Sequence, residues 1–332
     1  MAQKMIVPVT RPEYEKGKTV FSAVETLEFV PVAPEEDTLA AFVRQHRCRA
    51  AVIGVSKYRG PLYQALSQRG LLVRFGVATD NIDREKARDR AILIANTPGA
   101  LDQAVAEHTL FLMGALVRHL TRSDQEVKAG KWNPLVGEQL SSLRLGLVGL
   151  GNIGFQVACL AHQGFGMETL IFSRHSPEET ASRRGLSVEN LRLRLGWSLW
   201  SDRVEEILPG SDIVSVHLPL TEKTAGFFHA ARFARFKTGS FFINTARGGL
   251  VVEKDLAQAI LSGKLAGAAL DVFQKEPYQP TDGVDLRQLP GVIMTPHIAS
   301  NTRTANLRMA RMVVENILHW ERGELDLVHL VR

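Results

Sequence analysis

The stretch Leu145-Gly-Leu-Val-Gly149-Leu-Gly151-Asn-Ile-Gly154 determines how the rest of the chain can be interpreted. A short apolar run, suited to a buried strand, turns through three glycines and enters a helix-compatible segment, residues 155–164. Here Gly149 permits a tight turn, Gly151 permits close approach of a pyrophosphate, and Gly154 lets the helix pack closely on the strand. Because a helix N-terminus presents free N–H groups and a positive dipole end, the stretch predicts a dinucleotide site.

Nearly 150 residues precede this stretch, so the front of the chain must build something else. A length of 332 residues exceeds one ordinary core and indicates two domains. Short apolar segments alternate with helical ones in the front part and predict a small α/β unit. Strands are expected at residues 5–9, 27–32, 51–55, 71–75 and 92–95, and helices at residues 38–46, 60–69 and 83–90, with Asp83 as an N-cap. A long, largely apolar helix is expected to follow from Asp102 to about Leu120, with Asp102 as its cap.

The alternation of strands and helices resumes after the glycine stretch. Five short apolar segments suit a parallel sheet covered on both faces, namely residues 169–172, 212–217, 240–244, 268–272 and 292–295. An amphipathic helix is expected over residues 302–320. One segment, residues 177–201, is rich in arginine and carries two tryptophans, and it predicts a surface excursion between the second and third strands of the sheet.

Composition excludes several classes of function. The chain is 45% hydrophobic and 23% charged, as in soluble globular proteins, and its net charge of +5 comes from 40 basic and 35 acidic residues, which favours no nucleic-acid partner. No apolar stretch reaches the roughly 20 residues of a membrane span, and the N-terminus lacks the apolar region of a secretion signal. Cys48 and Cys159 lack metal-ligand spacing, so we expect no metal site, reduced thiols and a cytoplasmic protein.

The end of the second strand after the glycine stretch bears on the choice of cofactor. NAD enzymes place an acidic residue there for the ribose 2′-hydroxyl, and that acid would repel a 2′-phosphate. This chain has Ser173-Arg174-His175 instead. Serine and histidine can hydrogen-bond a phosphate, and arginine can bind it as a charged fork. The sequence therefore predicts that NADP(H) is preferred, with NAD(H) as the second cofactor.

Polar side chains follow three further strands of the predicted sheet. They are Arg247 in Phe242-Ile-Asn-Thr-Ala-Arg247, Glu276 in Leu270-Asp271-Val-Phe-Gln-Lys-Glu276, and His297 in Met294-Thr-Pro-His297. Ligands of open α/β sheets bind at the carboxyl ends of the strands, so these residues point to one crevice. Reduction of a 2-keto acid needs a cation for the carboxylate, which Arg247 can supply, and a proton donor, which His297 can supply. Glu276 would orient the imidazole and favour its protonated form.

These segments together resemble the D-2-hydroxyacid dehydrogenases, a family that includes D-lactate and phosphoglycerate dehydrogenases and glyoxylate/hydroxypyruvate reductases. The resemblance covers nearly the whole chain and extends to residues 74–83, 96–109 and 216–221. It implies a doubly wound, parallel-sheet Rossmann cofactor domain (residues 101–298) inserted in a smaller flavodoxin-like α/β substrate domain (residues 1–100 and 299–332). It also implies hydride transfer from the cofactor to a small 2-keto acid of the glyoxylate or hydroxypyruvate type.

The resemblance implies which residues of this chain form the site. The catalytic residues fall on Arg247, Glu276 and His297, and the loop that binds the substrate carboxylate falls on Gly76, Val77 and Ala78. Cofactor contacts fall on the following residues: Val105, Thr109, Gly149, Gly151, Asn152, Ile153, Gly154, Ser173, Arg174, His175, His217, Pro219, Thr245, Ala246 and Asp271.

Two departures from the family are visible. Ala78 stands where glycine is common, and the segment 177–201 is longer than usual, with no role assigned to it. Two alternative functions stay open, a phosphite- or formate-type dehydrogenase and a dinucleotide-sensing, corepressor-like binding protein. Residues 74–83 contain no lysine, which argues against phosphite oxidation. The family is usually dimeric, so we expect a homodimer with its interface along residues 102–120 and 132–139.

Overall fold

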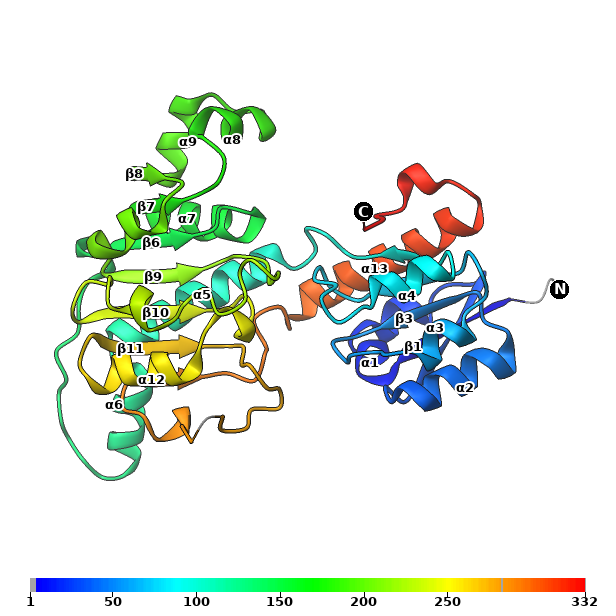
Figure 1. Cartoon of the computed structure of the whole chain (residues 1–332), viewed down its shortest axis with the longest axis horizontal. Helices are drawn as coiled ribbons and strands as arrows, with labels where there is room; N and C mark the ends of the chain where they lie inside the picture. The colour runs from blue at the N-terminus through cyan, green and yellow to red at the C-terminus, as the bar shows by residue number, and fades with distance from the viewer. Residues whose placement is uncertain (1–3, 282, 332) are drawn as a thin grey trace. The chain divides into compact units, whose positions relative to one another are not determined.

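The computed structural model describes residues 4–281 and 283–331 and divides into two compact units (Figure 1). The first unit comprises Met1–Leu101 and Ser300–Arg332, and the second comprises Asp102–Ala299. Residues 1–3 and 332, which fall in the predicted substrate domain, lie outside the described residues; residues 1–3 also belong to the segment expected to lack a secretion signal. Each unit is built on its own parallel sheet.

The sheet of the first unit has the strand order β2-β1-β3-β4-β5. Its strands are β1 (Met5–Thr10), β2 (Leu27–Val32), β3 (Ala50–Ile53), β4 (Leu71–Arg74) and β5 (Leu93–Ala95). The helices of this unit are α1 (Arg11–Phe21), α2 (Glu36–His46), α3 (Pro61–Ala65), α4 (Arg84–Asp89) and α13 (Arg303–Glu321). This order is that of flavodoxin-like doubly wound sheets, as predicted.

The sheet of the second unit has the order β12-β11-β10-β9-β6-β7-β8. Its strands are β6 (Arg144–Val148), β7 (Glu168–Phe172), β8 (Trp197–Ser201), β9 (Ile213–Val216), β10 (Ser240–Asn244), β11 (Leu265–Leu270) and β12 (Val292–Met294). Counted from β6, the order is 3-2-1-4-5-6-7, which is the Rossmann order 3-2-1-4-5-6 with one further strand, β12, at the edge; this confirms the predicted fold class. The strand order reverses at β6, so the glycine loop that follows β6 lies where ligands bind in such sheets.

The helices of the second unit begin with a break that the sequence did not predict. They are α5 (Asp102–Val117), α6 (Leu120–Lys128), α7 (Asn152–Phe165), α8 (Pro177–Arg183), α9 (Val188–Leu195), α10 (Val204–Ile207), α11 (Ala230–Phe233) and α12 (Glu253–Leu261). The helix expected over residues 102–120 ends at Val117, because His119 adopts a left-handed backbone conformation with φ +52°. A separate helix then starts at Leu120.

Two elements of the first unit also differ from expectation. Helix α1 was not predicted, because its sequence is mostly polar; the helix buries Gly17, where an added Cβ would come within 2.7 Å of Ala310 Cβ on α13. The helix expected over residues 60–69 is only α3, because Leu66 already has an extended backbone. The predicted helix cap at Asp83 is confirmed, since its carboxylate accepts the N–H of Lys86.

The segment 177–201 is more than the predicted surface excursion. It forms α8 and α9 and then β8, which pairs in parallel with β7 and extends the sheet by one strand. Figure 1 shows α8 and α9 beyond β8, at the edge of the sheet. Trp197 and Trp200, in edge-to-face contact at 5.2 Å, lie in β8 and explain the aromatic bias of the segment.

The buried residues of the strands form the hydrophobic cores of the two sheets. No helix in the described part of the chain combines the length and the apolar composition of a membrane span. Within residues 4–281 and 283–331, His, Cys, Asp and Glu side chains form no group of three or more that could hold a metal ion.

Candidate active site

The glycine loop between β6 and α7 has the geometry that a dinucleotide pyrophosphate requires. Gly149 has φ +105°, and a Cβ there would lie 2.8 Å from the carbonyl oxygen of His217. At Gly154, a Cβ would lie 2.2 Å from the carbonyl oxygen of Gly149. The first turn of α7 can therefore pack this closely against the loop only if residue 154 is glycine. A Cβ on Gly151 would meet nothing within 4 Å. The loop is therefore tight where it packs and open where a phosphate group can approach.

The first turn of α7 supplies donors on this loop. The first intrahelical hydrogen bond runs from Phe155 N–H to the Gly151 carbonyl (3.0 Å), which leaves the preceding N–H groups without helical partners. Asn152 and Ile153 belong to that turn, and the side chain of Asn152 hydrogen-bonds the buried carboxylate of Asp102. Burial raises the pKa of Asp102, against the opposite effect of this bond and of the nearby Arg184. The turn thus fits a pyrophosphate, as the sequence predicts.

The end of β7 carries Ser173, Arg174 and His175, and no acidic side chain stands among these three residues. Ser173 is buried, and its Oγ accepts the N–H of His175 (3.2 Å), whereas Arg174 is exposed. Both ring nitrogens of His175 have side-chain neighbours: Nδ1 lies 3.4 Å from Glu179 Oε2, and Nε2 lies 3.0 Å from Arg183 Nη1. His175 therefore contacts other side chains through both ring nitrogens, while the side chain of Arg174 is exposed to solvent.

His217 and Pro219 follow β9. The imidazole of His217 lies 2.9 Å from Ser215 Oγ, and burial lowers its pKa to about 3, so the ring is neutral at ordinary pH. Its carbonyl oxygen is the one that faces Gly149. Pro219 is exposed, and its carbonyl accepts the hydroxyl of Thr224 (2.6 Å). His217 thus supports the glycine loop from the neighbouring strand.

A buried pair of hydroxyls links α5 to the end of β10. Thr109 Oγ1 donates to the carbonyl of Val105 (2.8 Å) and lies 2.9 Å from Thr245 Oγ1, which is the donor in that second bond. Ala246 follows, and its N–H is held by Asn244 Oδ1 (3.0 Å). These residues, matched above to cofactor contacts, lie together at the carboxyl end of the sheet.

Asp271, at the end of β11, is fully buried and organises the segment that carries His297. Its carboxylate accepts the hydroxyl of Thr295 (2.6 Å) and the N–H groups of Ile298 (2.8 Å) and Ala299 (2.9 Å). Burial acts to raise the pKa of Asp271, but the hydrogen bonds, including one from His108, outweigh it and lower the pKa. Asp271 is therefore an anion that fixes residues 295–299.

Arg247 is positioned by a turn at the end of β10. Asn244 Nδ2 donates to the carbonyl of Arg247 (2.9 Å), and Arg247 Nη1 donates to the carbonyl of Ala246 (2.6 Å). The turn passes so close to the chain after β11 that a Cβ on Gly248 would lie 1.9 Å from the carbonyl carbon of Phe273. Arg247 is half-buried, so its guanidinium is held by packing and still reachable by a ligand.

His297 and Glu276 form a directly bonded pair. Nδ1 of His297 lies 2.7 Å from Glu276 Oε2, and the other carboxylate oxygen accepts the N–H of Phe273 (3.0 Å). Burial acts to raise the pKa of Glu276, but His297, the Phe273 N–H and the charge of Arg247 lower it overall. With Glu276 as acceptor, Nδ1 carries a proton and Nε2 is left for a substrate. Arginine, histidine and carboxylate thus form one electrostatic group.

The loop 76–78 belongs to the first unit and follows β4. Gly76 has φ +139°, and its N–H donates to Thr97 Oγ1 (3.0 Å), so this donor is already occupied. The carbonyl of Val77 accepts Asn96 Nδ2 (2.6 Å). The N–H groups of Val77 and Ala78 have no backbone acceptor within the described residues. These two N–H groups, rather than all three, fit the binding of an anion.

Sequence reasoning missed His108 and Arg184. His108 Nε2 lies 3.3 Å from Thr295 Oγ1 and 3.6 Å from Asp271 Oδ1. Its signal was a polar residue inside an apolar helix, next to Thr109. Arg184 Nη2 donates to the carbonyl of Gly151 (3.3 Å), a contact that no local pattern indicates, because 33 residues separate the two.

Comparison with known proteins shows which family this chain resembles. The family described as D-isomer specific 2-hydroxyacid dehydrogenase, NAD binding domain, matches residues 110–299. A D-3-phosphoglycerate dehydrogenase from Bacillus subtilis (strain 168) is 35% identical over 294 residues, covering 88% of this chain but 52% of that protein. This chain thus spans about half the length of that relative.

Two other relatives match along most of their length. A hydroxypyruvate reductase from Thermotoga maritima is 35% identical over 298 residues, covering 89% of this chain and 88% of that protein. The crystal structure of an NADPH-dependent glyoxylate/hydroxypyruvate reductase from Sinorhizobium meliloti with NADP and malonate superposes with a TM-score of 0.79 at 26% identity, covering 96% of this chain and 94% of the other. This chain belongs to the D-isomer specific 2-hydroxyacid dehydrogenase family.

Proposed function

We propose that the protein reduces a small 2-keto acid to a D-2-hydroxy acid with NADPH. The observation that carries the proposal is the bonded pair of His297 and Glu276 with Arg247 close enough to lower the pKa of the carboxylate. When bound, the nicotinamide supplies a hydride. In this proposal the second unit is the cofactor domain, and the first unit is the substrate domain.

The chain's own residues account for the remaining chemistry. Arg247 pairs with the substrate carboxylate and polarises the keto oxygen. In the first unit, the N–H groups of Val77 and Ala78 are suited to binding a carboxylate. His297 donates a proton from Nε2 to the oxygen as the carbonyl is reduced. Glu276 keeps the proton of Nδ1 in place and stabilises the imidazolium before that transfer. In the reverse direction, His297 accepts the proton.

Hydroxypyruvate and glyoxylate are the substrates we favour, because relatives that match this chain along most of its length are a hydroxypyruvate reductase and a glyoxylate/hydroxypyruvate reductase. The test is a panel of 2-keto acids, with phosphite and formate as comparison substrates, measured with each cofactor. Turnover of hydroxypyruvate or glyoxylate supports the proposal. Binding of NADPH without turnover of any 2-keto acid would contradict it and favour a dinucleotide-sensing protein.

The preference for NADPH rests on the end of β7. Ser173 and Arg174 stand there without an acidic residue, and the exposed guanidinium of Arg174 is suited to a 2′-phosphate. We expect kcat/KM to be at least tenfold higher with NADPH than with NADH, and Arg174→Asp to reverse the order, because a carboxylate repels the phosphate. A tenfold preference for NADH in the native protein would defeat this part of the proposal.

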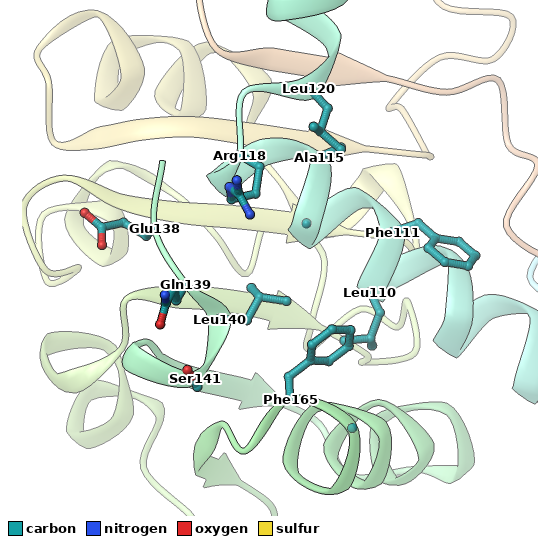
Figure 2. A pocket seen from close by; sticks show the side chains of 12 residues that line it. Leu110, Phe111, Ala115, Arg118, Leu120, Glu138, Gln139, Leu140, Ser141 and Phe165 are labelled. Carbon is teal, nitrogen blue, oxygen red and sulfur yellow. The ribbon is translucent and has the colours of Figure 1, made fainter. Parts of the chain in front are cut away.

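A homodimer is proposed from one apolar surface of the second unit. A groove of about 660 Å³ is lined by the outer face of α5, by residues 138–141 and by the end of α7 (Figure 2). The rings of Phe111 and Phe165 lie at it, and Phe111 is 71% exposed. Trp132 and Val136, 87% and 89% exposed, lie a few residues before the segment 138–141. The exposed apolar side chains at the groove favour a protein partner, for which we propose a second copy.

The dimer is tested by sedimentation velocity. Phe111→Asp places a charge on this surface and is expected to give monomers. Leu193→Asp is the matched control, since Leu193 is 67% exposed on α9 and lies outside the groove. An unchanged association state of Phe111→Asp would contradict the proposed interface. We also propose a cytoplasmic location, in keeping with the free cysteines Cys48 and Cys159.

A further inference from the structure

The segment α8–α9–β8 has a place next to the proposed cofactor site. It follows directly on Ser173–His175 and returns as β8 beside β7. The indole Nε1 of Trp200 in β8 donates to the carbonyl of His175 (3.0 Å), so the end of the segment holds the residues at its start. The two ends of the segment are therefore in contact beside the end of β7.

Arg184 docks the end of α8 on the glycine loop. Its Nη2 donates to the carbonyl of Gly151 (3.3 Å), and its guanidinium carbon lies 3.8 Å from the centroid of the Phe155 ring in the first turn of α7. Burial lowers the pKa of Arg184, while the charge of Asp102 acts to raise it. A half-buried, stacked arginine with a carbonyl partner is a fixed contact. Helix α8 is therefore tied to the loop that fits the pyrophosphate.

Arg183, the last residue of α8, is held beside the end of β7. Its Nη1 lies 3.0 Å from His175 Nε2, and Glu179 Oε2 lies 3.4 Å from His175 Nδ1. An arginine can only donate, so Nε2 accepts and the proton of the imidazole lies on Nδ1, toward Glu179. The bond uses one N–H of the guanidinium and leaves its other donors exposed. Arg183 is thus a cation held by His175, the residue that follows Arg174 in the chain.

The carboxylates of α8 do not cancel these cations. Glu179 is engaged in a capping box, in which its Oε2 accepts the N–H of Ser176 (3.2 Å), in addition to its contact with His175. Glu178 is exposed in the same turn. Against these two acids stand Arg174, Arg183 and Arg184. Arg184 interacts with the charge of Asp102, so the exposed side chains of Arg174 and Arg183 are the cations of this group that a dianionic phosphate monoester can reach.

We propose that Arg183 and Arg174 together bind the 2′-phosphate of the adenosine ribose, and that His175 is a positioning residue for Arg183. This inference rests on the proposed preference for NADPH, and it assigns the segment 177–201 a role in selecting the cofactor. Arg174 lies at the end of β7, where a residue that contacts the ribose is expected, whereas Arg183 lies at the end of α8. Helix α8 is anchored by Arg184, which contacts the glycine loop.

The test measures binding, without turnover, by calorimetric titration with 2′,5′-ADP and with 5′-AMP, which differ by the 2′-phosphate. Arg183→Ala is expected to weaken binding of 2′,5′-ADP about fivefold to tenfold and to leave 5′-AMP unchanged. His175→Ala is expected to weaken 2′,5′-ADP less, and to add nothing once Arg183 is alanine, because it acts through Arg183. A purely structural role of His175 would shift both ligands.

Arg192→Ala is the matched control. It removes the same charge from the same segment, but the guanidinium of Arg192 lies over Trp197, which pairs with Thr169 near the start of β7, at the opposite end of the strand from Ser173. We expect no change for either ligand. Thermal melting of each variant checks the fold, and Arg183→Gln serves as a second variant if the alanine form melts early.

The outcomes distinguish a failure of the role of Arg183 from a failure of the proposed preference for NADPH. If the native protein binds 2′,5′-ADP no better than 5′-AMP, the preference for NADPH fails, and the inference fails with it. If the native protein prefers 2′,5′-ADP and Arg174→Ala removes the preference, but Arg183→Ala and Arg183→Gln leave it intact, only the role of Arg183 is overturned. Equal weakening of both ligands by the Arg183 variants would also overturn it.

Discussion

The imidazole of His297 and the carboxylate of Glu276 are joined by a 2.7 Å contact between Nδ1 and Oε2, although 21 residues separate them in the chain. The Phe273 N–H holds the second carboxylate oxygen at 3.0 Å. His297 itself is fixed by its own N–H, which donates to the carbonyl of Asp271 (2.9 Å). The pair is therefore ordered before any substrate arrives, and its proton-bearing nitrogen is set by the carboxylate.

Glu276→Gln is expected to lower kcat by about 10²-fold. The amide oxygen can still accept the proton of Nδ1, but the variant lacks the negative charge that stabilises the imidazolium. Cofactor affinity, measured by quenching of protein fluorescence, should stay the same. An unchanged kcat with 2-keto acids would remove Glu276 from the mechanism.

The contribution of Glu276 to the stability of the protein should be lost at acid pH. Its pKa is lowered in the folded state, so its ionised form stabilises the fold above the ordinary value of 4.5, and this contribution is lost as the pH falls through the lower folded pKa. The difference in melting temperature between the native protein and Glu276→Gln should therefore be largest near neutral pH and shrink below about pH 4. A difference independent of pH would mean that the charge does not matter for stability.

Gly151 and Gly154 should respond in opposite ways to alanine. Gly154→Ala forces a Cβ to within 2.2 Å of the Gly149 carbonyl, so the loop must shift and the melting temperature should fall. In Gly151→Ala the Cβ meets no protein atom within 4 Å, so the fold should be kept while the methyl group hinders the pyrophosphate. Melting curves and cofactor titration of the two variants give the comparison, which fails if Gly151→Ala binds the cofactor normally.

Asp271→Ala should destabilise the protein by about 1–3 kcal/mol for each buried donor left without an acceptor. The N–H of Ala299 loses its acceptor, and the segment that carries His297 loses its anchor, so kcat should fall as well. Urea unfolding measures the loss, with the exposed Asp202→Ala as control. Equal stability of the two variants would show that residues 295–299 are held by other contacts.

Much of the fold could be predicted from local patterns. The turn at Gly149–Gly154 and the alternation of buried strands with helices were sufficient for the Rossmann sheet, because each depends on residues close in sequence. Helix α1 escaped prediction because its sequence is polar and its burial depends on α13, which lies almost 300 residues further along the chain. Strand β8 escaped because its pairing partner, β7, decides its structure.

In the candidate site, too, some residues could be predicted from the sequence and others could not. Arg247, Glu276 and His297 could be proposed because each follows a predicted strand, and strand ends of a parallel sheet gather at one edge. The occupied N–H of Gly76 and the engaged ring of His175 could not be foreseen. Both depend on a partner, Thr97 or Arg183, whose side-chain direction only the folded chain defines.

The left-handed backbone of His297, with φ +54°, limits which inactive form of the protein is useful. Asparagine and glycine tolerate this conformation, whereas β-branched side chains do not. For trapping a complete ternary complex in a crystal, His297→Asn therefore removes the proton donor with the least disturbance to the peptide geometry. A valine at this position would confound lost chemistry with a displaced chain.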